Sequence, residues 1–167
     1  MKHFLFVFVF LFLTSLILSA QQQEKVDFIQ GKVDIKIDPK GETITGSVTY
    51  KLKVLQNVDT VFLDAQNINL IEVKLNNKKV KTTNNGKKIV VHKRFKVNKT
   101  YTLDITYTAN PKQTVYFLGW KDDLLGNEQV WTQGQGKYTS HWLPSFDDMT
   151  EKVEYDLDIS FDRTYEV

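Results

Sequence analysis

The chain has 167 residues, enough for one domain or for a leader peptide followed by one domain. Residues 1–20 hold one lysine and no acid, so the other 147 residues carry 21 basic and 20 acidic side chains. This balance gives no electrostatic reason to expect nucleic acid or an anionic membrane as a partner. The absence of cysteine excludes disulfides, cysteine nucleophiles, thiolate zinc sites and a lipid-anchored cysteine.

Residues 1–20 have the pattern of a signal peptide. A short polar start precedes an apolar run over residues 4–13, which is shorter than the roughly 20 residues of a spanning helix. Ser19 and Ala20 form a plausible cleavage site, after which the mature chain would begin at Gln21. We therefore expect an exported protein that is periplasmic, cell-surface or secreted; an uncleaved N-terminal anchor is the alternative.

Strict alternation of apolar and polar residues dominates after residue 25, and this is the period of half-buried strands. Polar turn sequences separate the alternating runs, and no stretch of a dozen residues has a helical period. The sequence therefore predicts an all-β fold, an antiparallel β-sandwich or large curved sheet with at least one face in water. The apolar faces are expected to be Val33/Ile35/Ile37, Ile44/Gly46/Val48/Tyr50/Leu52/Val54, Ile71/Val73/Leu75, Tyr101/Leu103/Ile105/Tyr107 and Val153/Tyr155/Leu157/Ile159/Phe161.

Two pairs of basic residues flank the short apolar run over residues 89–91. They are Lys87-Lys88 and Lys93-Arg94. Charged residues of this kind commonly protect the ends and edges of hairpins. We assign them to hairpin edges in preference to a ligand-binding patch.

The alternation breaks between residues 115 and 149, where aromatic residues, glycines and glutamines are concentrated. Such a segment is where function is expected to concentrate, although most aromatic residues in all-β domains pack the core. If Trp120, Trp131 and Trp142 were exposed together, they would suit a stand-alone secreted β-sandwich that binds a glycan or a protein. That reading is kept as an alternative.

No catalytic motif is complete in this chain. His92 and His141 lack the spacing of the zinc-hydrolase helix, and no nucleophile elbow, Walker loop or dinucleotide fingerprint occurs. Asp147, Asp148 and Glu151 could form a carboxylate cluster for calcium or acid–base chemistry. A solvated turn whose aspartates cap backbone N–H groups is the more common role of such residues. We therefore predict no catalytic residue and no metal ligand.

The sequence Thr-Gln-Gly-Gln at 132–135, followed by His-Trp-Leu-Pro-Ser-Phe-Asp-Asp at 141–148, forms a two-part motif. It resembles the N-terminal domain of the aminopeptidase N family of zinc metallopeptidases, where Thr-Gln-x-Glu or Thr-Gln-x-Gln precedes Phe-Pro-Cys-Phe-Asp-Glu-Pro at a matching spacing. The resemblance extends over residues 27–162. Two departures are Ser145, where the family has cysteine, and Met149, where it has proline.

The resemblance implies a saddle-shaped, mostly antiparallel domain over residues 21–167, incomplete at its C-terminus, that covers the active site of a separate catalytic domain. In the family, the residue matching Gln135 lines the pocket for the first substrate side chain and helps to hold the free amino terminus. Gln133 is the weaker candidate for substrate binding. A neutral amide suits this role because its oxygen accepts a hydrogen bond from an ammonium group.

The resemblance also implies the cofactor and partners. Zinc would lie in the catalytic domain, which would be part of the same polypeptide or a separate chain, and the substrate would be a peptide amino terminus. The motifs of that catalytic domain are absent from the 167 residues. The chain alone is therefore expected to bind no zinc and to cleave no peptide. A non-functional gene fragment is the remaining alternative.

Overall fold

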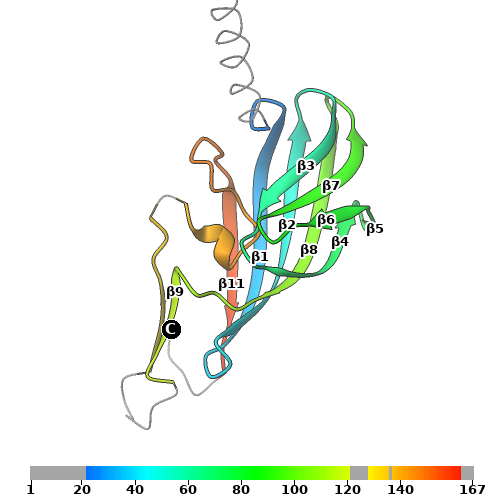
Figure 1. Ribbon diagram of the computed structural model, residues 1–167. Helices are drawn as coiled ribbons and strands as arrows, with labels where there is room; N and C mark the ends of the chain where they lie inside the picture. The colour runs from blue at the N-terminus through cyan, green and yellow to red at the C-terminus, as the bar shows by residue number, and fades with distance from the viewer. Residues whose placement is uncertain (1–21, 121–127, 136, 163–167) are drawn as a thin grey trace, which may run out of the picture.

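The computed structural model describes residues 22–120, 128–135 and 137–162, and strands are their main secondary structure (Figure 1). The predicted signal peptide, residues 1–20, lies outside them. The strands are β1 (Val26–Asp38), β2 (Thr43–Val54), β3 (Val58–Asp64), β4 (Asn69–Leu75), β5 (Lys78–Lys79), β6 (Thr82–Asn84), β7 (Lys88–Phe95), β8 (Thr100–Ala109), β9 (Val115–Leu118), β10 (Gln129–Thr132) and β11 (Glu154–Ser160). A 3-10 turn occupies Thr139–His141. Across the described ranges, no helix is long and apolar enough to cross a membrane.

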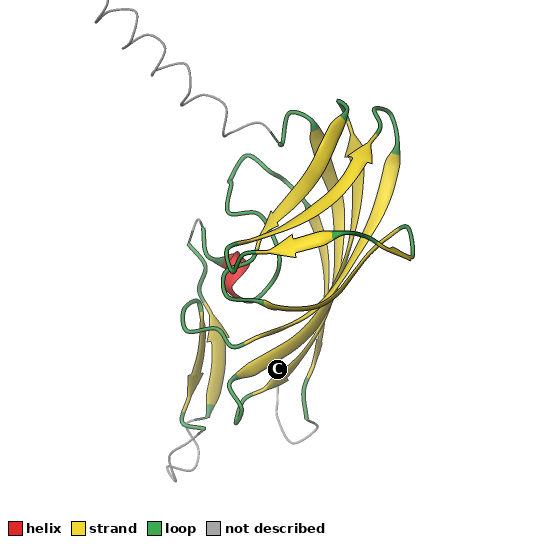
Figure 2. Cartoon of the chain, turned by 45° about the vertical axis from the view of Figure 1, so that its right-hand side comes forward, coloured by secondary structure: helices red, strands yellow, loops and turns green. Residues whose placement is uncertain are grey.

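The strands form three sheets. The largest has six strands in the order β11-β1-β2-β8-β4-β5, the second has the order β3-β7-β6, and β9 and β10 form a two-stranded hairpin. The β3-β7-β6 sheet lies across part of the large sheet, and buried residues of both sheets form one core (Figure 2). The predicted all-β, antiparallel class is confirmed. One pair differs, because β1 and β11 are parallel.

The predicted alternation is confirmed in the middle of the large sheet. β2 alternates buried and exposed residues along nearly its whole length, and its antiparallel neighbour β8 buries Leu103, Ile105 and Tyr107. Gly46 provides the space in which the Tyr107 ring packs, since a Cβ at Gly46 would lie 2.6 Å from the Tyr107 hydroxyl oxygen. The sequence thus places a glycine in β2 at the position where the Tyr107 ring of β8 packs.

The prediction is wrong for one residue of β4. Ile71 was expected to face the core with Val73 and Leu75, but its side chain is 57% exposed. The pairing with β8 shifts register between Leu70 and Glu72, and this β-bulge turns Ile71 outward. Alternation cannot reveal such a shift, because an inserted residue changes the face without changing the composition of the strand.

The last strand is only partly covered. Tyr155, Leu157 and Ile159 of β11 share the core-side face of β1, as predicted, yet they remain between 42% and 47% exposed. Leu157 and Ile159 line a groove of about 210 Å³ between the end of the large sheet and the β9-β10 hairpin. The apolar face of β11 therefore borders a groove instead of a closed core.

Candidate functional site

Both candidate glutamines lie in the loop that follows β10. Gln133 and Gln135 are exposed. The Gln133 N–H donates to the carbonyl of Thr114 (2.9 Å), and the Gln135 carbonyl accepts the N–H of Lys137 (3.1 Å). Thr114 is itself buried, and its hydroxyl donates to the carbonyl of Tyr138 (3.3 Å). The backbone of the loop is thus held at both ends while the two side chains face outward.

The second half of the motif is buried and attached to the β3 end of the smaller sheet. Leu143 and Ser145 are buried, and the Ser145 backbone exchanges two hydrogen bonds with Asp64, of 2.8 and 3.0 Å. The Phe146 ring packs against Phe28 and Tyr50, with centroid separations of 4.5 and 5.8 Å. This segment therefore contacts both sheets at once.

Side-chain hydrogen bonds add to this attachment. The Tyr50 hydroxyl donates to the carbonyl of Pro144 (2.6 Å) within the core, and Asp64 Oδ2 accepts the Asp147 N–H (3.0 Å). The Ser140 hydroxyl donates to Asp147 Oδ2 (2.8 Å). Each bond satisfies a backbone or carboxyl group that would otherwise be desolvated without a partner. The segment that follows the glutamine loop is consequently well fixed.

The three carboxylates near the motif have different roles. Asp148 accepts both the N–H and the hydroxyl of Thr150, at 2.9 and 2.7 Å, and these bonds lower the pKa of its carboxyl. This is the turn-capping role expected from the sequence. Burial, together with the negative charge of Asp64, raises the pKa of Asp147. Burial also raises the pKa of Glu151, which accepts the Phe28 N–H at 3.2 Å.

The described residues do not fit a metal ion. Within residues 22–120, 128–135 and 137–162, no group of three or more His, Cys, Asp or Glu side chains is arranged to hold one. Asp148 accepts the N–H of Thr150 and Glu151 accepts the N–H of Phe28, so each has a partner within the protein. The geometry of the described residues therefore does not support calcium binding by this cluster. No chemical step is assigned to a metal in this chain.

The departure at Ser145 has a structural cost. Its side chain is 2% exposed, and its hydroxyl has no hydrogen-bond partner among the described residues. The family that the motif resembles has cysteine at this position. A thiol behaves as a small apolar group and needs no strong hydrogen-bond partner. The site is therefore shaped for an apolar side chain.

The three tryptophans have different surroundings. Trp131 is exposed and stacks on Tyr116, with centroids 4.4 Å apart and ring planes 25° apart. The Trp120 indole donates to the carbonyl of Gln129 (2.8 Å). Trp142 packs against the core and lines the groove beside β11. Packing and hydrogen bonding account for Trp120 and Trp142, and Trp131 alone of the three is exposed.

Two residues with long-range contacts at β3 were not found from the sequence. Asp64 contacts the motif through its backbone and its carboxylate, yet nothing in its local pattern distinguishes it from any polar residue at a strand end. The Gln22 side chain pairs with the backbone of Phe62, donating at 2.8 Å and accepting at 2.7 Å. Both contacts join segments far apart in the sequence, so no local signal could indicate them.

Comparisons with known proteins agree with the resemblance. The chain matches the Peptidase M1 N-terminal domain over residues 25–167. The M1 zinc metallopeptidase from Deinococcus radiodurans superposes with a TM-score of 0.71 at 14% identity, over 84% of this chain and 33% of that chain. Yeast LTA4 hydrolase in complex with bestatin gives 0.73 at 22% identity, over 84% of this chain and 24% of that one. No curated protein matches.

The structural matches and the family match support different conclusions. At such identities the structural match shows the fold alone, and the chain spans only about a quarter to a third of those two proteins. The family match covers nearly all of the described residues, including the glutamine loop and the segment attached to Asp64. The chain belongs to the peptidase M1 N-terminal domain family.

Proposed function

We propose that this chain is the substrate-covering N-terminal domain of an exported zinc aminopeptidase, and that Gln135 binds the free amino terminus of the peptide. The main support is the contrast within the motif. Both glutamine side chains are exposed, whereas the Gln133 backbone and the segment from Ser140 to Asp147 are held by hydrogen bonds. A binding group needs an open side chain on a fixed backbone. Thr114 fixes the Gln133 backbone, and the Gln135 carbonyl accepts the N–H of Lys137 two residues later.

Gln135 suits an ammonium group chemically. Its amide oxygen can accept one of the three ammonium hydrogens, and its NH2 group can donate to a substrate carbonyl. Holding the amine fixes the position of the first peptide bond, which is the contribution to catalysis that this domain would make. Zinc and the reacting groups belong to the catalytic domain in this proposal, whether that domain is in the same polypeptide or in a separate chain.

Isolation of the complete assembly tests this proposal. Antibodies against the described domain would recover the protein from its source, and hydrolysis of an aminoacyl anilide would be measured on the recovered material. The Gln135→Ala variant should lower kcat/KM about tenfold or more, because a hydrogen bond to a charged group is lost. Gln133→Ala is the matched control and should have a smaller effect. Unchanged kinetics in Gln135→Ala would refute the assigned role.

The chain on its own should be inactive. Its described residues supply no metal site, so the purified chain is expected to leave aminoacyl anilides intact with or without added zinc. Equilibrium dialysis with zinc should likewise detect no tight binding. Metal-dependent hydrolysis by the purified chain would contradict the proposal that zinc and the reacting groups belong to the catalytic domain.

Export is tested separately. Cell fractionation should find the protein outside the cytoplasm, and N-terminal sequencing of the mature form should begin at Gln21. An intact N-terminus that starts at Met1 and a membrane-bound protein would instead favour an uncleaved anchor.

A further inference from the structure

Positive charge is concentrated in one part of the chain, despite the near-neutral total. Residues 73–103 contain ten basic side chains and no acidic one, whereas residues 147–162 contain seven acids and one lysine. The first stretch includes β5, at one edge of the large sheet, and β6 and β7 of the smaller sheet, whereas β11 of the second stretch forms the opposite edge of the large sheet. The fold therefore separates charges that cancel in the overall composition.

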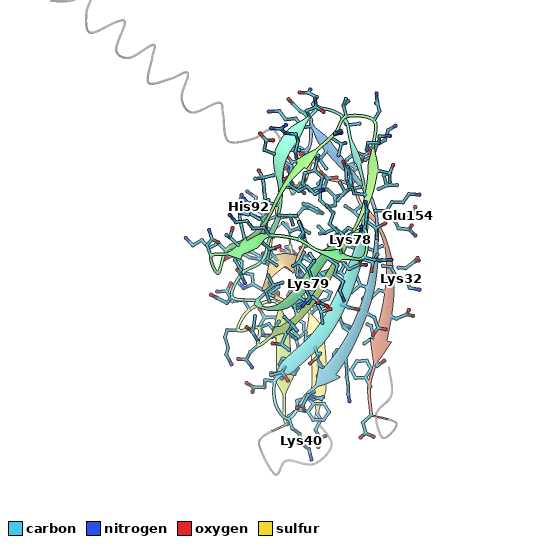
Figure 3. The ribbon with its side chains drawn as sticks, turned by 90° about the vertical axis from the view of Figure 1, so that its right-hand side faces the viewer. Lys32, Lys40, Lys78, Lys79, His92 and Glu154 are labelled. Carbon is cyan, nitrogen blue, oxygen red and sulfur yellow. The ribbon has the colours of Figure 1, made fainter. Side chains whose placement is uncertain are left out.

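The basic residues form an exposed surface, here called the basic face, on β5, β7 and the turns beside them. Figure 3 labels Lys78 and Lys79 of β5, at the edge of the large sheet, and His92 of β7, in the smaller sheet. β7 has eight residues, so its charges extend over about 25 Å at roughly 3.3 Å per residue. The basic face consists of Lys78, Lys79, Lys81, Lys87, Lys88, Lys93, Arg94, Lys96 and Lys99.

Few of these cations are neutralised within the protein. Lys79 pairs with Glu72, Lys88 with Asp64 and Arg94 with Asp59, at 3.4, 3.7 and 3.5 Å. Arg94 and Asp59 are each more than 80% exposed, so their pair contributes little. No acid among the described residues pairs with the other six, which are Lys78, Lys81, Lys87, Lys93, Lys96 and Lys99.

A β-bulge concentrates charge near the end of β7. Thr60 pairs with His92 and Val58 with Phe95, so Lys93 and Arg94 together oppose a single residue of β3. Both side chains consequently point into solvent, in contrast to the alternation of a regular strand. The bulge places two adjacent cations on one surface.

A hollow lies beside this bulge. Its volume is about 560 Å³, and three of its six lining residues are cations: Arg94, Lys96 and Lys99. Asp59 is the one acid in the lining, and Asn57 and Val97 complete it. A depression with this charge can accept a carboxylate or sulfate group together with part of the ring that carries it.

We propose that the basic face binds a linear anionic polysaccharide, which replaces the assignment of its lysine and arginine pairs to hairpin edges alone. Cations spaced along an extended strand match charges spaced along a polymer, and the exposed Asn98 side chain can bond a sugar hydroxyl. Residues 73–103 expose no large aromatic ring on which a nucleic-acid base could stack. Val97 is their one exposed large apolar side chain, which is too little for insertion into a membrane. This inference does not depend on the aminopeptidase proposal.

The test measures binding of the purified protein to size-defined heparin and polygalacturonate oligosaccharides by calorimetry. Binding of at least one should weaken steeply as salt rises, because exposed charges are screened. The triple variant Lys93→Gln/Arg94→Gln/Lys96→Gln should weaken it about tenfold or more, since each exposed ion pair adds a small increment. All three side chains are exposed, so the fold should be retained, as circular dichroism would check.

A matched control has the same net charge. Lys32→Gln/Lys36→Gln/Lys40→Gln removes three exposed lysines from β1 and the turn after it, none of which belongs to the basic face, and should change binding less than about twofold. Equal losses in both variants would show a general charge effect and overturn the proposal. No binding to either oligosaccharide would also overturn it. Equal or tighter binding to single-stranded DNA or phosphatidylserine vesicles would overturn the choice of partner.

Discussion

The middle of the large sheet and the segment over residues 139–151 are built in different ways. In β2 and β8, every second residue is buried and the backbone pairs continuously over ten positions. The 139–151 segment has one short turn of 3-10 helix, and its place depends on a few contacts to Asp64, Tyr50 and Phe28. Repetition specifies the sheet, whereas a few long-range hydrogen bonds specify the segment beside the proposed binding loop.

This difference has a consequence for substitutions. In the sheet, the damaging changes are those that alter volume, because close packing leaves no room for an added group. In the segment, the damaging changes are those that remove one donor or acceptor and leave its partner buried and unsatisfied. The comparison can therefore be tested with pairs of small substitutions.

The largest effect is expected from Gly46→Ala. The new methyl group would lie 2.6 Å from the Tyr107 hydroxyl oxygen and ring, so we expect a loss of about 1–3 kcal/mol of unfolding free energy. Gly134→Ala is the control in the glutamine loop, where the nearest side-chain atom to a new Cβ is 3.7 Å away. Urea denaturation measures both. Equal stability of the two variants would mean that the sheet tolerates added volume there.

The next effect distinguishes two buried tyrosine hydroxyls. Tyr50→Phe removes the bond to the Pro144 carbonyl and should cost about 1–2 kcal/mol. Tyr107→Phe removes a hydroxyl that has no partner among the described residues, so it should be neutral or stabilising. The same denaturation series compares them. If Tyr107→Phe were the more destabilising change, the hydrogen bonding described for the segment would be contradicted.

A smaller effect, of opposite sign, is expected at Ser145. Ser145→Ala removes a buried, unpartnered hydroxyl and keeps the backbone pairing with Asp64, so stability should rise by up to about 1 kcal/mol. Ser145→Cys should behave similarly, because a thiol is the more apolar group. A decrease in the thermal midpoint of both variants would show that the hydroxyl has a partner in solution.

The smallest effect concerns pH. Burial, with Asp27 and Asp148 nearby, raises the pKa of the Glu151 carboxyl. The folded state then holds this proton more tightly than the unfolded chain. Glu151 therefore favours folding below the usual glutamate range, and that contribution is lost as pH rises through the raised pKa.

Glu151→Gln retains an acceptor for the Phe28 N–H and removes the charge. It should raise the unfolding free energy at about pH 8 by less than about 1 kcal/mol, because the group is half-exposed. At about pH 3.5 it should give no gain in unfolding free energy. Urea denaturation at the two pH values measures both. Asp148→Asn has the opposite sign, because the pKa of Asp148 is lowered by its bonds to Thr150. A parallel shift of Glu151→Gln at both pH values would exclude the electrostatic explanation.

The sequence predicted the fold to the extent that the fold is local. Alternation gave the buried faces of β1, β2 and β8, and the turn sequences separated them. It failed at Ile71, where a bulge exchanges the faces, and it did not indicate that β11 runs parallel to β1. Register shifts and strand order depend on partners distant in the sequence, so no local pattern contains them.

The sequence predicted where the candidate site lies, but it did not predict which residues hold the neighbouring segment in place. The two-part motif located the loop that carries Gln133 and Gln135, and the structure shows both side chains exposed. The residues that hold the neighbouring segment, chiefly Asp64 and Tyr50, lie in strands far upstream. Their importance comes from position in three dimensions, which residue types and spacing do not encode.

The parallel pair of β1 and β11 sets the order in which the domain can assemble. Gly31 pairs with Tyr155, so the first long strand receives its second neighbour only after nearly all of the described chain is available. β2 can close onto β1 early through a short turn, whereas β11 must close a loop of more than a hundred residues, at an entropic cost that local pairing avoids. During synthesis, the outer edge of β1 therefore stays unpaired until β11 is available, and until then this edge needs protection from association with other chains.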